Sequence, residues 1–142
     1  MKLRLLFALL ITGTVCAQQN AFNYELDLSK ENDSFNVTIS NLHLSTGDSI
    51  FIFVSYAPGV YQPLDFGRFV KLFKVYTEDG TELITNKISI NDFQIIHPHK
   101  ASKIVYEIDD SFDMSIDYHP IYPMCGTGIT PRYSIVNSHG VF

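Results

Sequence analysis

Apolar and polar side chains alternate with a period of two near the start of the chain, over residues 22–29 and again over residues 35–40. A strand points successive side chains to opposite faces, so this period is typical of strands with one buried face and one wet face. A short polar stretch with turn character, residues 30–34, separates the two runs. The sequence therefore predicts an antiparallel hairpin in this part of the fold.

Short apolar runs with turn residues between them continue the β pattern along the chain. Residues 49–56 are mostly apolar and predict a strand that is buried on both faces. Asp79-Gly80 is a strong hairpin signal between a strand that ends at Thr77 and a partner that begins at Thr81. Further strands are predicted over residues 93–96, 103–108 and 132–136, with a loop over residues 119–131. We expect an all-β fold without a long helix, either an antiparallel β-sandwich or an open, saddle-shaped sheet of many short strands.

The length and the charge of the chain restrict its class. The 142 residues are enough for one domain with a substantial core, and 46% apolar with 18% charged residues is not the composition of a disordered chain. The formal net charge of -5 comes without any cluster of Lys and Arg. Because contacts to phosphates need such clusters, we expect no nucleic-acid partner.

Residues 1–17 have the organisation of a secretory signal peptide. A positive region with Lys2 and Arg4 precedes an apolar core that is too short to span a bilayer. We expect cleavage after Ala17, so that the mature protein begins at Gln18 and is periplasmic or secreted. After this cleavage no stable membrane insertion is expected.

A lipoprotein anchor on Cys16 is the alternative for this leader. That motif has a small residue directly before the cysteine and usually a leucine three positions before it, where this chain has Val15 and Gly13. The sequence therefore favours a removable signal. Its removal leaves a single cysteine, Cys125, which has no neighbouring base and is predicted to be buried and inert.

Two patterns have some of the features of metal sites. On a strand, His97 and His99 would share one face and could reach one ion, but no third ligand stands near them, and two solvated histidines at a strand end are commoner. An acidic run lacks the central Gly and terminal Glu of a calcium loop, and we expect it to be a solvated loop. It consists of Asp109, Asp110, Asp113 and Asp117. With no H-E-x-x-H and no G-x-S-x-G motif, the residues alone provide no catalytic candidate.

The densest turn chemistry lies in A-P-G-V-Y-Q-P-L-D-F-G-R-F, residues 57–69. Pro58-Gly59 predicts a turn in which the glycine takes a positive φ. Asp65 and Arg68 stand three apart, so one helical turn would bring their carboxylate and guanidinium together. We expect this pair to hold the shape of the loop, in preference to a direct contact with a ligand. The candidate loop or interface residues are Pro58, Gly59, Tyr61, Asp65, Gly67 and Arg68.

A series of short motifs follows in a fixed order from this loop. P-G-V-Y is followed by D-F-G-R, V-K-L-F-K-V-Y-T-E-D-G-T-E-L, I-N-D-F-Q-I, K-I-V-Y-E-I and N-S-H-G-V-F. The series resembles the N-terminal domain of the M61 glycyl aminopeptidases, which has a P-G-S-Y-like turn, a following Arg and an N-x-W-x-I-like strand. The resemblance covers residues 22–142. This chain differs from the family pattern at Val60, where the family has a small hydroxyl residue, and at Phe93, where Trp is common.

The resemblance implies that residues 18–142 form the non-catalytic β domain of a secreted zinc aminopeptidase that favours small N-terminal residues such as Gly or Ala. The zinc ligands of that family lie on H-E-x-x-H in a helical domain that follows the β domain. Zinc is thus implied only for that domain, and no catalytic, metal or cofactor residue is implied for this chain. We expect this chain to end before the catalytic domain, which would be its partner, in the same or another chain.

A freestanding exported β-sandwich that binds a glycan, a peptide or a protein is the alternative function. The signal peptide and the 13% aromatic content favour it. The lack of Trp disfavours the glycan version, because sugar-binding platforms often use Trp.

Overall fold

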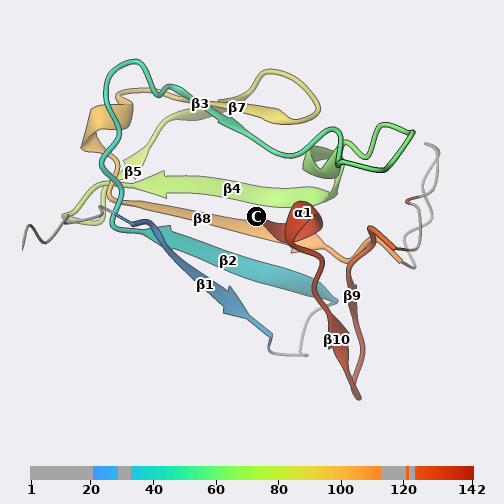
Figure 1. Cartoon of the computed structure of the whole chain (residues 1–142). Helices are drawn as coiled ribbons and strands as arrows, with labels where there is room; N and C mark the ends of the chain where they lie inside the picture. Colours follow the sequence, from blue (N-terminus) through green and yellow to red (C-terminus); the bar gives the residue numbers. More distant parts are fainter. Residues whose placement is uncertain (1–20, 29–32, 113–120, 122–123) are drawn as a thin grey trace, which may run out of the picture.

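The computed structural model describes residues 21–28, 33–112, 121 and 124–142, which form antiparallel sheets of short strands (Figure 1). The larger sheet has the strand order β1-β2-β8-β4-β5, so that β8 lies at its centre between β2 and β4. Its strands are β1 (Asn23–Asp27), β2 (Ser34–Ser40), β4 (Val70–Tyr76), β5 (Glu82–Leu83) and β8 (Lys103–Asp109). The predicted hairpin of β1 and β2 is confirmed, with Tyr24 opposite Ile39.

A smaller sheet with the order β3-β7-β6 lies over one face of the larger sheet (Figure 1). Its strands are β3 (Ile50–Ile52), β6 (Thr85–Lys87) and β7 (Asp92–Ile95). A two-stranded ribbon and three short helical turns complete the described chain: β9 (Gly128–Ile129), β10 (Ser134–Ile135), η1 (Phe66–Phe69), η2 (Pro98–Lys100) and α1 (Ser138–Val141). Within the described ranges, no helix is long and apolar enough to cross a membrane.

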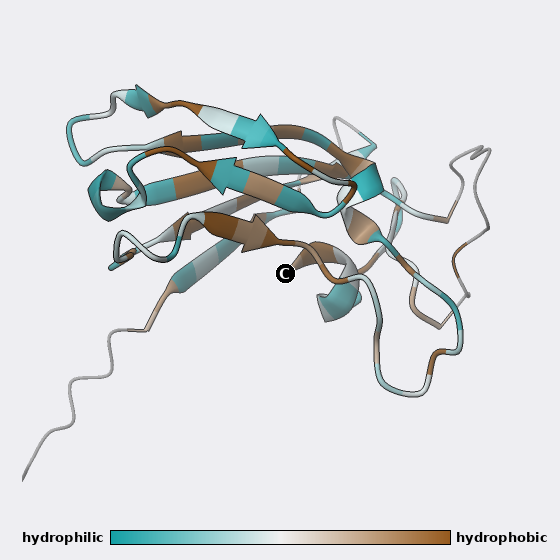
Figure 2. Ribbon diagram, turned by 90° about the horizontal axis from the view of Figure 1, so that it is seen from above, coloured by the Kyte–Doolittle hydropathy of each residue, from teal (hydrophilic) through white to brown (hydrophobic). Residues whose placement is uncertain are grey.

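An aromatic cluster fills the space between the two sheets. Phe73 of β4 and Phe93 of β7 meet across this space with their rings tilted by 33° and the ring centroids 4.6 Å apart. Phe53 meets Tyr106 of β8 edge to face at 5.1 Å, and Phe51 packs against both Phe53 and Phe73. Burial of each such ring stabilises the fold by about 1.5–3 kcal/mol. The alternation of apolar and polar residues along the strands, visible as brown and teal bands in Figure 2, turns this apolar side inward.

The outer faces of the two sheets differ in character. On the larger sheet, Lys74 forms an ion pair with Glu82 at 2.9 Å, and the Lys103 ammonium lies 5.1 Å from the centroid of the Tyr76 ring. On the smaller sheet, apolar side chains are exposed to solvent instead, and Ile52 is 66% exposed. The larger sheet thus has a solvated outer face, whereas on the smaller sheet β3 exposes Ile50 and Ile52 beside the polar side chains of β7.

The last described residues pack into the fold. The Tyr106 hydroxyl donates to the carbonyl of Val141, whose side chain is fully buried. A Cβ atom on Gly140 would lie 2.9 Å from both Phe66 and Thr127, so α1 packs closely against η1 and the segment before β9. The α1 turn therefore joins the centre of the larger sheet to the loop that contains η1.

The all-β class is confirmed, with open antiparallel sheets, but the prediction for residues 49–56 is wrong. The strand covers only Ile50–Ile52, and its two terminal side chains are exposed by 40% and 66%. In the described part of the chain a layer covers only one face of β3, so Phe51 points inward while Ile50 and Ile52 point outward.

The segment before α1 also differs from the prediction. The strand expected over residues 132–136 is only Ser134–Ile135, and β9 falls inside the segment expected to be a loop. Two-residue strands are too short to show a period of two, so they leave no pattern in the sequence. Cys125 is buried, as predicted.

Candidate interface loop

The loop of residues 57–69 begins with a tight turn. The N–H of Val60 donates to the carbonyl of Ala57 at 3.1 Å, and Gly59 has a φ of 83°. Proline followed by such a glycine is the arrangement of a type II turn, because the ring sets the first φ and glycine takes the positive φ without steric cost. The turn predicted at Pro58-Gly59 is therefore confirmed.

Tyr61 follows this turn and is wholly exposed, at 103%. Together with Gly59, Val60 and Gln62 it lines a hollow of about 370 Å³ at the tip of the loop. An exposed tyrosine has a large apolar ring and a polar end, which suits it to contact surfaces. The tip thus has the features of an interaction site.

Asp65 fixes the other end of the loop. Its backbone is in the left-handed region with a φ of 47°, which is uncommon for a residue with a side chain. Its buried carboxylate accepts hydrogen bonds from the Ser55 hydroxyl at 2.6 Å and from the side-chain amide of Asn91 at 2.8 Å. The N–H of Leu64 also donates to the carbonyl of Ser55 at 2.7 Å. These bonds hold the loop against the segment that follows β3.

Gly67 allows η1 to approach the turn between β6 and β7. The Gly67 N–H donates to Oδ1 of Asn91 at 3.0 Å, and the Lys87 ammonium donates to the Gly67 carbonyl at 2.8 Å. A Cβ atom at this position would lie 2.3 Å from the carbonyl oxygen of Ile90 and 2.6 Å from Cα of Asn91. Since both neighbours are backbone atoms, only glycine fits this approach.

Asn91 and Lys87 are therefore the residues that connect the loop to the smaller sheet. The carbonyl of Asn91 also accepts the N–H of Phe53 at 2.9 Å, so its main chain is fixed by the strand pairing while its side chain holds the loop. Burial lowers the pKa of Lys87, whose ammonium also lies 5.1 Å from the centroid of the Phe93 ring. Both side chains extend the contact from the sheet to η1.

Arg68 lies on η1 and is half-buried. Its guanidinium carbon is 4.8 Å from the centroid of the Phe69 ring, which is a cation–π arrangement. The backbone N–H of Arg68 donates to the backbone carbonyl of Asp65 at 3.0 Å. The Asp65 carboxylate accepts the hydrogen bonds from Ser55 and Asn91 given above. The ion pair between Asp65 and Arg68 stays a prediction.

Comparison with known families tests the resemblance that the order of the motifs indicated. The model of the peptidase M61 N-terminal domain matches residues 23–142 of this chain. The chain belongs to the peptidase M61 N-terminal domain family. The resemblance inferred from the order of the motifs is thereby confirmed, whereas a search of the curated proteins found no match.

A solved structure shows a similar fold. It is that of an aminopeptidase N family protein from Idiomarina loihiensis, with a TM-score of 0.54 and 20% sequence identity. The match covers 67% of this chain and 16% of that chain, so this chain corresponds to only a small part of the length of the similar protein.

Three residues that hold the loop of this M61 N-terminal domain were not predicted: Ser55, Lys87 and Asn91. A signal existed for Asn91, because it is the Asn of I-N-D-F-Q-I, which matches the N-x-W-x-I-like strand of the family. For Ser55 and Lys87 we find no signal in the sequence. Lys87 reaches the Gly67 carbonyl only when β6 pairs with β7, and Ser55 meets Asp65 only when the loop turns back onto the segment after β3.

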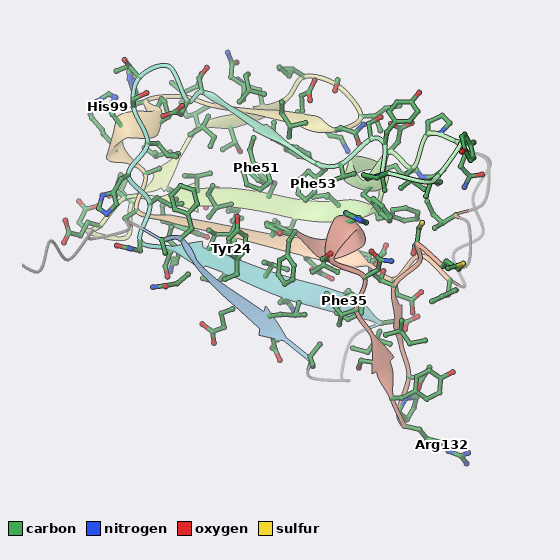
Figure 3. The ribbon with its side chains drawn as sticks, viewed as in Figure 1. Tyr24, Phe35, Phe51, Phe53, His99 and Arg132 are labelled. Carbon is green, nitrogen blue, oxygen red and sulfur yellow. The ribbon has the colours of Figure 1, made fainter. Side chains whose placement is uncertain are left out.

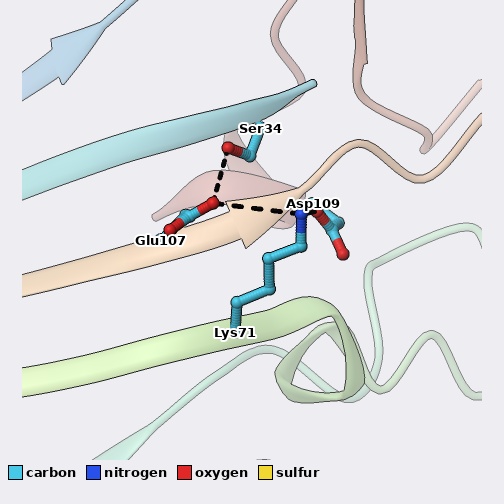
Figure 4. Close-up of polar contacts among 4 residues, drawn as sticks. All are labelled: Ser34, Lys71, Glu107 and Asp109. Carbon is cyan, nitrogen blue, oxygen red and sulfur yellow. Dashed lines mark hydrogen bonds and ion pairs between the residues drawn. The ribbon is translucent and has the colours of Figure 1, made fainter. Parts of the chain in front are cut away.

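A polar cluster joins three strands of the larger sheet (Figure 4). Ser34 donates to a Glu107 oxygen at 2.8 Å, and the Lys71 ammonium pairs with Asp109 and lies 3.9 Å from Glu107. The hydrogen bond with Asp109 raises the pKa of Lys71. The amine therefore stays protonated at neutral pH, and its contacts with Glu107 and Asp109 join β4 to β8.

His97 and His99 lie in a solvated turn, as predicted. His97 has a φ of 61°, both side chains are exposed, and their ring centroids are 6.0 Å apart. In the part of the chain that the structure describes, no three His, Cys, Asp or Glu side chains gather closely enough to hold a metal ion. These residues do not fit the zinc of the family, and the expectation that this chain contains no cofactor stays a prediction.

The acidic run differs from the prediction at Asp110. This residue is buried, and its two carboxylate oxygens accept the N–H groups of Phe112 and Ile129, each at 2.9 Å. The carboxylate is thus not solvated, because it satisfies backbone donors and joins the turn after β8 to β9. Asp113 and Asp117 lie outside the described residues.

Proposed function

We propose that this chain is the non-catalytic N-terminal β domain of an M61-type zinc aminopeptidase, and that the loop of residues 57–69 docks it against the catalytic domain. The family resemblance implies that such an enzyme removes small N-terminal residues such as Gly or Ala. The catalytic domain, in the same or another chain, is the partner.

One observation carries the proposal: the wholly exposed Tyr61 stands on a loop whose two ends are fixed. The type II turn holds one end, and the bonds among Asp65, Asn91 and Gly67 hold the other. A loop that is already ordered loses little conformational entropy on binding, so an aromatic side chain at its tip contributes more of its contact energy to affinity.

The proposal assigns the zinc and the peptide hydrolysis to the catalytic domain. A zinc peptidase needs three protein ligands around an open water position and a carboxylate that accepts the proton of the water. The described residues of this chain contain no such cluster. The role of this chain is therefore to dock, and through docking to shape the substrate cleft.

The leader supports an exported location for this domain. We propose cleavage after Ala17, on the basis of the positive region, the apolar core and the small residue at that position. The intact mass of the processed protein tests this. A chain that begins at Gln18 is expected, and a lipid-modified or full-length N-terminus would contradict it.

The docking is tested with purified proteins. The processed chain is titrated with an M61 catalytic domain that contains H-E-x-x-H, from the same genome, and binding is measured by calorimetry. Tyr61→Ala is expected to weaken binding at least about tenfold, as for an aromatic residue at the centre of an interface. Tyr133→Ala is the matched control, because Tyr133 is 58% exposed on another loop.

Equal binding by wild type and Tyr61→Ala would refute the role of the loop. If the two domains never associate, in solution or when coexpressed, the docking function itself is wrong. The freestanding binding module would then be the better description of this chain.

A further inference from the structure

Strand β3 presents an open edge. It lies at the end of the order β3-β7-β6, and its antiparallel ladder joins Ser49 to Ile95 and Phe53 to Asn91 by hydrogen bonds. Because such bonds occur at every second residue, the N–H and C=O groups of Ile50 and Ile52 point away from β7. Among the described residues, no other backbone or side-chain group bonds to them.

This edge lacks the charged side chains that protect the β1 edge of the larger sheet. β1, the terminal strand of the larger sheet, carries Glu25 and Asp27. Charged side chains on an edge strand discourage pairing with another chain. β3 carries only Ile50, Phe51 and Ile52, and both isoleucines are exposed. Of the two edges, β3 is therefore the one suited to accept a further strand.

An apolar cavity of about 280 Å³ lies between β3 and β1. Figure 3 shows Tyr24 on β1 and Phe51 on β3, which both line it, on opposite sides of the space between the sheets. Leu44 and Ile104 also line the cavity. A strand added to the β3 edge would turn every second side chain toward the cavity and the others toward solvent.

The rim of the cavity is acidic. Asp48 lines it and accepts the backbone N–H of Ser45 at 2.7 Å and the Ser45 hydroxyl at 2.8 Å. These hydrogen bonds lower the pKa of Asp48, so the carboxylate is charged at neutral pH. The exposed His43 also lines the cavity. A basic group on the ligand would be attracted to this rim, whereas an acidic group would be repelled.

We propose that the β3 edge and this cavity bind an extended peptide segment of another protein. The segment pairs its backbone with Ile50 and Ile52, places an aliphatic side chain in the cavity and brings a basic side chain near Asp48. Addition of a strand to a sheet edge takes affinity from the main chain and selectivity from the alternate side chains. This inference does not depend on the proposed docking of the 57–69 loop.

The test uses the processed chain and a fluorescent synthetic peptide in which Lys and Val alternate over seven residues. Two further peptides have the same charge and side chains but are N-methylated at every Val or at every Lys. In a paired strand, only one of these two sets of N–H groups faces β3. One methylated peptide is expected to bind at least about tenfold more weakly than the parent, the equivalent of one or two lost hydrogen bonds.

A protein variant and a map of the bound peptide complete the test. Ile52→Lys places a charge on the β3 edge and is expected to weaken binding at least tenfold. Ile84→Lys makes the same change of charge at a site that is 69% exposed and away from the β3 edge, and it should bind as wild type does. In NMR spectra of the wild type with saturating peptide, the amides of Ile50 and Ile52 should shift and exchange more slowly with solvent. An Asp-Val peptide of the same length is expected to bind more weakly than the Lys-Val peptide.

Three outcomes would overturn the proposal. The first is equal affinity for the parent and both methylated peptides, which would mean attraction by charge alone. The second is a shift of amides elsewhere, with those of Ile50 and Ile52 unchanged. The third is a dimer of this chain in solution that pairs β3 with β3 and excludes the peptide.

Discussion

The side-chain amide of Asn91 lies 2.8 Å from the carboxylate of Asp65, across 26 residues of sequence. The same side chain accepts the N–H of Gly67, so one asparagine holds two points of the candidate loop. The acceptor in the first bond is a buried charged group, which makes the bond stronger than one between two neutral groups. Asn91 is thus the residue whose loss should affect the loop most.

Asn91→Ala is expected to lower the free energy of unfolding by about 2–4 kcal/mol, because it removes two hydrogen bonds and leaves a buried carboxylate less satisfied. Chemical denaturation measures this. Asn86→Ala is the control, since Asn86 is exposed on the same hairpin and makes only a 3.4 Å bond to Gln94. Similar losses for the two variants would contradict the role of Asn91.

Gly67→Ala is expected to destabilise the protein by about 1–3 kcal/mol or more, because the new methyl group would meet backbone atoms of Ile90 and Asn91. The matched control is Gly47→Ala, where the nearest atom to a new Cβ is a serine hydroxyl at 3.6 Å. Thermal unfolding of both variants gives the comparison. A Gly67→Ala protein as stable as the control would show that η1 can move away from the β6–β7 turn at little cost.

Tyr106→Phe is expected to cost about 1–2 kcal/mol at neutral pH, because the Val141 carbonyl loses its donor inside the core. Burial raises the pKa of Tyr106 above its ordinary value of 10.0. Above that pH the unfolded chain loses the tyrosine proton and the folded chain keeps it, so the wild type loses stability as pH rises, by at most about 1.4 kcal/mol per pH unit. Denaturation between pH 8 and pH 11 should show a smaller loss in Tyr106→Phe. Parallel losses in both proteins would argue that Tyr106 ionises freely.

Arg68→Ala is expected to lower the free energy of unfolding by about 1–4 kcal/mol if the predicted pair with Asp65 is largely buried. A double-mutant cycle with Asp65→Ala separates the pair from other losses, since each side chain has further contacts. A coupling energy of more than about 0.5 kcal/mol would support the pair. Additive effects would show that Asp65 and Arg68 act on the loop independently.

The purified processed chain is expected to bind no zinc and to hydrolyse no glycyl or alanyl amide. His97 and His99 are exposed in a turn, and the described residues bring no third ligand to them. Native mass spectrometry with added zinc, together with a chromogenic substrate, tests both parts. One zinc per chain and turnover that His97→Ala abolishes would overturn the non-catalytic assignment.

The sequence was most informative where a local rule decides the structure. The alternation of apolar and polar residues correctly predicted the β1–β2 hairpin, and Pro58-Gly59 correctly predicted a turn with a positive φ. Asp79-Gly80 was read correctly for the same reason, because Gly80 has a φ of 86° and its N–H closes the turn on Thr77. In each case the residues that determine the conformation are neighbours in the chain.

The sequence was least informative where the partner of a residue is distant. The apolar run at residues 49–56 resembles a central strand, yet it ends at a sheet edge, because its position in the sheet depends on which strands pair with it. Lys87 and Asn91 meet the loop only after the β6–β7 hairpin has been placed over it. Asp110 looked solvated because its backbone partners were not foreseen.

The contact between Tyr106 and Val141 also sets the order in which the protein can finish folding. Tyr106 of the central strand β8 can bond to Val141, and Phe66 can pack against Gly140 of α1, only after residues 138–141 have left the ribosome. Tyr24 of β1 likewise packs edge to face against the ring of Phe142, at the other end of the described residues. Contacts between such distant residues form late and slowly. A nascent chain therefore cannot complete this core before residues 138–142 have been synthesised, so that its first strand pair and its last turn are closed in the same late step.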